Sequence, residues 1–105
     1  MTSEKYKLLE WVDENKLDIE GLSQNPNAVD FLKKINKVDW YYLSQNPNAV
    51  KILEKNLDNI NWVFLSENPN AIKILEENLD KVSWVLLSQN PNAIYLLMAN
   101  PEKIN

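Results

Sequence analysis

The sequence predicts an all-α fold, an α-solenoid of short helix pairs, and three observations lead to this prediction. First, an octapeptide of the form L-S-Q/E-N-P-N-A-V/I occurs four times, at residues 22–29, 43–50, 65–72 and 87–94. Second, successive copies are separated by 21, 22 and 22 residues, a period typical of stacked repeats. Third, the apolar residues after each copy follow helical spacing, while the single glycine disfavours a β fold rich in hairpins.

The first helix of each pair is expected to begin after Asp39, Asn61 and Ser83. Each of these residues precedes a tryptophan, and all three belong to the residue types that cap helix N-termini. The helix should end before the octapeptide proline, because the residue before a proline resists the α conformation. We therefore expect a helix of about two turns, which is too short to be stable without stacked neighbours.

The second helix is expected to begin at the Asn-Pro pair of the octapeptide. Asn68 is a good N-cap, and Pro69 suits the first helical position, where its missing N–H has no intrahelical partner. Ile72 and Leu75 lie three residues apart and share an apolar face. Asn78 suits the helix end, because asparagine tolerates the left-handed conformation found there.

The whole chain, residues 1–105, is interpreted as a single repeat domain. Its N-terminal segment is expected to form a capping helix that begins at Thr2 or Ser3, both good N-cap residues. The chain stops one residue before the next tryptophan would fall, so we expect apolar surface at that end to favour end-to-end self-association. The predicted parts are an N-terminal cap or half repeat at 1–21, repeats at 22–42, 43–64 and 65–86, and a C-terminal partial repeat at 87–105.

A leucine-rich-repeat-like α/β solenoid is the alternative fold that the spacing leaves open. Val82, Val85, Leu87, Asn90 and Ile94 loosely match the pattern of such repeats, which also tolerate a period of about 22 residues. In every octapeptide a proline directly follows the first asparagine, and this favours the all-α form. The length and amphipathic pattern expected of the second helix favour it as well.

The composition excludes several classes of function. The chain has no cysteine and no histidine, which removes disulfides, thiolate chemistry, most zinc sites and the usual general base. We therefore assign no catalytic, cofactor-binding or metal-binding residue, and we expect the protein not to be an enzyme. All 11 basic residues are lysines and the net charge is −4, whereas nucleic-acid-binding proteins usually have a basic face, so no nucleic acid is expected as a partner.

Signals for a membrane are also missing from the sequence. No apolar run reaches the roughly 18–20 residues that a membrane-spanning helix needs. The first residues, MTSEKYKLLEW, lack the basic and then apolar order of a signal peptide. We therefore expect a soluble intracellular protein that does not associate with membranes.

The repeat pattern resembles that of a group of viral proteins. The pattern L-S-x-N-P-N-A-I/V-x-x-L-E-x-N-x-x-x-I-x-W is carried well by ENPNAIKILEENLDKVSW, and ANPEKIN resembles the Asn-Pro form of the loop between units. It looks like the short tandem repeats of proteins encoded by giant DNA viruses of the mimivirus type, over nearly the whole chain. The resemblance implies a viral origin, a repeat fold and a location in the host cytoplasm, and it implies no catalytic residue.

Residues that recur in every unit are interpreted as structural. The first octapeptide asparagine is expected to cap the second helix and to hydrogen bond to the adjacent unit. The second asparagine is expected to bond the adjacent loop, and the serine hydroxyl to bond back to its helix or to an asparagine. The tryptophans share a helical face with core leucines and are expected in the core. The structural set is Asn25, Pro26, Asn46, Pro47, Asn68, Pro69, Asn90, Pro91, Trp40, Trp62 and Trp84.

Positions at which the units differ are interpreted as solvent-exposed. On the second helix, one such position holds Asp30, Lys51, Lys73 and Tyr95 in successive units. On the first helix, two varying positions lie four residues apart and form one stripe on the side away from the tryptophans. A tyrosine in this stripe suits a binding anchor. The candidate protein-binding surface, called the stripe below, consists of Tyr41, Gln45, Val63, Glu67, Val85 and Gln89.

The expected function is that of a non-enzymatic repeat scaffold for protein–protein or protein–peptide interaction. The alternative is a structural or assembly module, or an engineered repeat fragment, without a specific ligand. The first function predicts a partner that is lost when the stripe is altered. The second predicts end-to-end association that depends on concentration.

Overall fold

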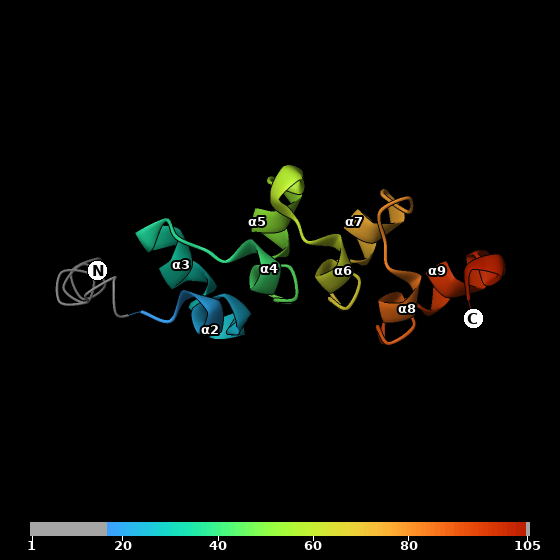
Figure 1. Ribbon diagram of the computed structural model, residues 1–105, viewed down its shortest axis with the longest axis horizontal. Coiled ribbons are helices and arrows are strands. Elements are labelled where there is room, and N and C mark those ends of the chain that lie inside the picture. The colour runs from blue at the N-terminus through green and yellow to red at the C-terminus, as the bar shows by residue number, and fades with distance from the viewer. Residues whose placement is uncertain (1–16, 105) are drawn as a thin grey trace.

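The computed structural model describes residues 17–104, so the predicted N-terminal capping helix lies outside the described part of the chain. The molecule measures 53 × 26 × 22 Å along its principal axes, and its helices follow one another along the longest axis (Figure 1). No strand occurs among residues 17–104, which confirms the all-α class; the leucine-rich-repeat-like alternative, which needs a strand in every unit, is wrong. The elements, with η for a 3₁₀ helix, are α2 (Ile19–Gln24), η2 (Pro26–Ala28), α3 (Val29–Ile35), α4 (Trp40–Leu43), α5 (Val50–Glu54), η3 (Leu57–Asn59), α6 (Trp62–Leu65), α7 (Ile72–Glu76), α8 (Trp84–Leu87), α9 (Ile94–Ala99) and η4 (Pro101–Lys103).

The first helix of each unit begins where the sequence predicts. The side chain of Asp39 accepts hydrogen bonds from the backbone N–H groups of Tyr41 and Tyr42, at 3.0 and 3.3 Å. Asn61 and Ser83 cap α6 and α8 in the same manner. The predicted length of two turns is wrong, since α4, α6 and α8 have 4 residues each. Beyond these residues the backbone tightens to i→i−3 hydrogen bonds ahead of the proline, which disfavours the α conformation before it.

The second helix begins later than predicted. The side chain of Asn68 accepts a hydrogen bond from the N–H of Asn70 (3.0 Å), and the N–H of Ala71 donates to the carbonyl of Asn68 (3.1 Å). These bonds close a turn that contains Pro69, and α7 begins only at Ile72, without a side-chain cap. The predicted N-cap role is therefore wrong for the α-helix, because the asparagine caps the turn that joins the two helices. The same side-chain bond is made by Asn25, Asn46 and Asn90.

The second helices end in two ways. Asn56, Asn78 and Asn100 each donate a side-chain hydrogen bond to the carbonyl four residues earlier, at 2.7, 2.8 and 2.9 Å. The left-handed conformation predicted for Asn78 is wrong, because its backbone stays at negative φ and its side chain bonds the last turn instead. Within residues 17–104, only Asn36 among non-glycine residues has a positive φ, of 56°. It directly ends α3, in the unit with the shorter spacing, whereas α5 is followed by η3. The one-residue difference in spacing is thus absorbed at this helix end.

Leucines and alanines from successive units form a continuous core. In the last three octapeptides the leucine and the alanine are fully buried, at 0% exposure: Leu43, Leu65, Leu87, Ala49, Ala71 and Ala93. The tryptophans, which were expected in the core, are half-buried and pack against it. None of the helices in the described part of the chain has the length and apolar character needed to cross a membrane.

Candidate functional site

Buried asparagines join successive units. The side-chain amide nitrogen of Asn68 donates to the carbonyl oxygens of Ser44 (3.0 Å) and Asn46 (2.9 Å) in the preceding unit. Asn46 and Asn90 make the same pair of bonds to their preceding units. These three asparagines are between 0% and 4% exposed, and every buried side-chain nitrogen or oxygen among the described residues has a partner. The predicted bonding between units is confirmed, and it uses both amide hydrogens, which leaves none to donate to a ligand.

The second octapeptide asparagine bonds the turn of the preceding unit, as predicted. The side-chain amide of Asn70 donates to the carbonyl of Pro47 at 2.8 Å, and that of Asn48 donates to Pro26 at the same distance. Asn92 repeats the bond at 2.7 Å. Since these asparagines are exposed, their bonds contribute less to stability than those of the buried row.

The serine hydroxyls make one bond that the sequence predicts and one that it does not. Ser44 Oγ donates to the carbonyl of Trp40 (2.7 Å), which is the expected bond back to the helix. The same oxygen accepts a hydrogen bond, at 2.9 Å, from the backbone N–H of Asn61, which caps α6, the first helix of the next helix pair. Ser66 repeats both bonds, and Ser23 makes the second one. In the sequence, each of these serines precedes the N-cap residue of the following first helix by 16 or 17 residues. This nearly constant spacing is the only sequence signal of the contact.

The stripe contains three exposed apolar or aromatic residues at the same position of successive first helices. Tyr41, Val63 and Val85 are 48%, 50% and 67% exposed. Of the polar stripe residues, Gln45 and Glu67 are half-buried and Gln89 is exposed. The stripe thus lies at the surface, with its apolar members more open to solvent than the first two of its polar members.

The ring of Tyr41 is held in place by aromatic neighbours. It meets Phe64 of the next unit edge-on, with ring centroids 4.0 Å apart, and Tyr42 at 5.3 Å. The sequence shows these aromatic residues but does not predict their contact, because Phe64 lies 23 positions further along the chain. A tyrosine ordered in this way loses little conformational freedom on binding.

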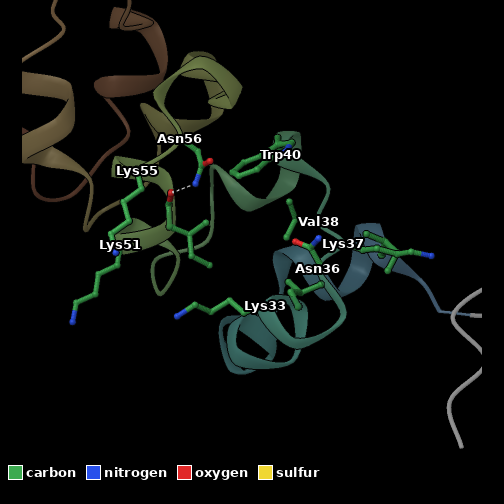
Figure 2. A pocket seen from close by; sticks show the side chains of 11 residues that line it. Lys33, Asn36, Lys37, Val38, Trp40, Lys51, Lys55 and Asn56 are labelled. Carbon is green, nitrogen blue, oxygen red and sulfur yellow. Dashed lines mark hydrogen bonds between the residues drawn. The ribbon is translucent and has the colours of Figure 1, made fainter. Parts of the chain in front are cut away.

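A groove that the sequence reading does not reveal lies between α3 and α5 (Figure 2). It has a volume of about 830 Å³. Its lining includes Trp40 and the lysines Lys33, Lys37, Lys51 and Lys55. In the sequence, these lysines form two pairs with four-residue spacing, one pair per unit, which is the signal that could have located the groove.

The structure offers little for metal chemistry in the part of the chain that it describes. Residues 17–104 contain no group of three or more histidine, cysteine, aspartate or glutamate side chains placed to hold a metal ion. What they do present is a hydrogen-bonded framework, a surface stripe and a lysine-lined groove.

Comparison with known proteins gives no family for this chain. No protein-family model matches the sequence, and no curated protein or solved structure matches the chain. Any function must therefore be inferred from the surfaces themselves.

Proposed function

We propose that the protein is an α-solenoid that acts as a non-enzymatic scaffold for a protein or peptide partner. The observation that carries this proposal is the joint between units, which repeats its contacts in one register. Each of the three described joints has four hydrogen bonds that involve a side chain: two from a buried asparagine, one from an exposed asparagine and one to a serine. Directional bonds of this kind resist sliding of one unit over the next. They favour a rigid surface, which loses little entropy when a partner binds.

The stripe is the binding surface that we propose for this scaffold. Tyr41, Val63 and Val85 are exposed at equivalent positions of α4, α6 and α8. Exposed apolar residues that recur along one surface are typical of interaction sites. Tyr41 has the properties of an anchor, since it is large, amphipathic and held by Phe64.

The test compares a stripe variant with a matched surface variant. The stripe variant carries Tyr41→Ala, Val63→Ser and Val85→Ser, and the control carries the exposed changes Lys73→Ser and Glu76→Ser on α7. Both should retain the circular dichroism of the wild-type chain. A partner identified by crosslinking should bind wild type and control with equal affinity and the stripe variant at least about tenfold more weakly, since the anchor is lost. Equal binding by all three would refute the assignment of this surface.

An assembly module is the second candidate, and α9 provides the observation that favours it. Tyr95 is 82% and Met98 is 67% exposed, at positions where the preceding unit has Lys73 and Glu76. A second copy packed against the exposed face of α9 would cover these apolar side chains.

Sedimentation across a dilution series tests the assembly candidate. The wild-type chain should associate as its concentration rises. A variant with Tyr95→Lys and Met98→Glu, which places the residues of the preceding unit on α9, should associate less. A chain that stays monomeric at every concentration would exclude this candidate.

The proposal also includes a viral origin and a location in the host cytoplasm. Both rest on the resemblance of the repeat pattern to proteins of giant DNA viruses.

A further inference from the structure

The groove between α3 and α5 combines an apolar floor with a basic rim. Leu32, Trp40 and Ile52 contribute to the floor. The side chains of Lys33, Lys51 and Lys55 gather on one side of the groove, whereas Lys37 extends on the other side (Figure 2). No carboxylate is among the described residues that line it. The groove is therefore a basic and partly apolar site on a chain whose net charge is −4.

The next joint along the chain provides an internal comparison. The corresponding groove between α5 and α7 has a volume of only about 270 Å³, and Leu57 of η3 is part of its lining. The first joint has no equivalent of η3, because α3 ends directly at the left-handed Asn36. The shorter spacing of the first unit thus leaves open the space that the 3₁₀ turn occupies in the next unit.

The charges of the two grooves differ as well. The position of Lys33 is occupied by Glu54 in the next unit, and that of Lys55 by Glu77, and both glutamates line the smaller groove. Lysines near a helix C-terminus interact favourably with the helix dipole, which could explain Lys33. Lys51 lies in the last turn of the five-residue α5, so the dipole favours a lysine there as well. Stacking itself does not require the lysines, because the next joint forms the same hydrogen bonds with glutamates at two of these positions.

We propose that this groove binds an acidic peptide that carries an aromatic or large aliphatic side chain. The peptide carboxylates contact the ammonium groups of Lys33, Lys51 and Lys55, and the apolar side chain lies on the floor beside Trp40 and Ile52. A volume of about 830 Å³ falls within the range of roughly 300–1,000 Å³ that is usual for ligand sites. Lysines are point charges on flexible stems, so they suit separate carboxylates better than a planar group that needs bidentate contacts.

A peptide fits the groove better than a nucleic acid does. A nucleic acid needs basic groups along an extended surface to neutralise several phosphates. Here four lysines line one groove, whereas the adjoining groove of the next joint is lined by Glu54 and Glu77 with a single lysine, Lys73, so its charge would not favour a phosphate backbone. The proposal does not depend on the stripe, whose apolar members lie on the first helices and whose predicted polar members, Gln45, Glu67 and Gln89, lie in the turns that follow them.

The test is a titration of the full 105-residue chain with a fluorescein-labelled peptide of sequence Glu-Glu-Phe-Glu-Glu, followed by fluorescence anisotropy. We expect a Kd on the order of 100 µM at low salt, weakened by added salt because exposed charge pairs are screened. The variant Lys33→Glu with Lys55→Glu, which copies the charges of the next joint, should bind about tenfold more weakly or not at all. The control Lys73→Glu with Lys103→Glu makes the same change of net charge away from the groove and should bind within about twofold of wild type.

Three further probes complete the test. The peptide Glu-Glu-Ser-Glu-Glu should bind more weakly than the phenylalanine peptide, and equal binding would remove the role of the apolar floor. Tighter binding of a ten-nucleotide oligothymidine than of the peptide would overturn the proposal in favour of a nucleic acid. No measurable peptide binding, or equal weakening by both lysine double variants, would overturn it as well. The stripe variant should bind the peptide as wild type does, so failure of either proposal leaves the other intact.

Discussion

Asn68 donates a side-chain hydrogen bond to the backbone carbonyl of Asn46, its counterpart in the preceding unit, at 2.9 Å. Asn90 makes the same bond to Asn68. Each internal asparagine of this row is thus a donor through its side chain toward one neighbour and an acceptor through its backbone toward the other. The side chains are buried, so these bonds form in a medium of low dielectric, where an unpaired group is costly.

Replacing Asn68 should therefore destabilise the protein more than replacing Asn70. Asn68→Ala removes three hydrogen bonds and leaves the carbonyls of Ser44 and Asn46 without this donor, so we expect a loss of about 2–4 kcal/mol in the free energy of unfolding. Asn70→Ala removes one exposed side-chain bond and should cost about 0.5–1 kcal/mol. Urea denaturation measures both, and equal losses would contradict the role given to the buried row.

The serines allow a second matched comparison. Ser44 is fully buried and its Oγ accepts the N–H of Asn61, so Ser44→Ala should cost about 1–2 kcal/mol. Ser88 is exposed, and among the described residues its Oγ bonds only Trp84, so Ser88→Ala should cost less than about 0.5 kcal/mol. Thermal unfolding of the two variants under one set of conditions checks the difference. A larger effect of Ser88→Ala would show that the bond between units is not the important one.

The core leucines should be more sensitive than the leucine of the 3₁₀ turn. Leu65 is 0% exposed, so Leu65→Ala should lower the free energy of unfolding by about 2–5 kcal/mol through lost burial and a new cavity. Leu57 is 43% exposed in η3, and Leu57→Ala should cost about 1 kcal/mol or less. Chemical denaturation of both variants provides the measurement, and similar losses would mean that the core is not continuous through α6.

The helix end at Asn36 predicts an unusual tolerance for glycine. Asn36 has a φ of 56°, which glycine adopts without strain, so Asn36→Gly should change stability by less than about 0.5 kcal/mol. Asn36→Val should cost about 1–2 kcal/mol, because a β-branched residue is strained in that conformation.

Asn56 serves as the control, since its φ is −136° and its side chain bonds the carbonyl of Ile52. Asn56→Gly loses that bond without relieving any strain, and it should cost about 1 kcal/mol. Circular dichroism during thermal melts distinguishes the variants. If glycine were tolerated equally at both positions, the two helix ends would not differ as described.

Much of the local structure could be predicted from the residues alone. The caps at Asp39, Asn61 and Ser83 are confirmed, because capping depends on side-chain type and on contacts within three residues. The exposure of the varying positions on the second helices is likewise confirmed, for instance at Lys51 and Lys73. The second helices are shorter than the sequence predicts, because the asparagine side chain closes a separate turn at Asn-Pro before the helix begins.

The sequence predicts the order of the elements, their period and their buried faces, since each depends on neighbours within about one helical turn. Three features cannot be predicted in this way: the acceptors of Asn68, the contact between Ser44 and Asn61, and the groove rimmed by Lys33 and Lys55. Their partners lie 17 to 24 residues apart and meet only once the units have stacked. The missing residue in the first spacing is visible in the printed sequence, but its consequence depends on where packing places α3 against α5. Local propensities set each helix, and the geometry of stacking sets which surfaces remain open to a partner.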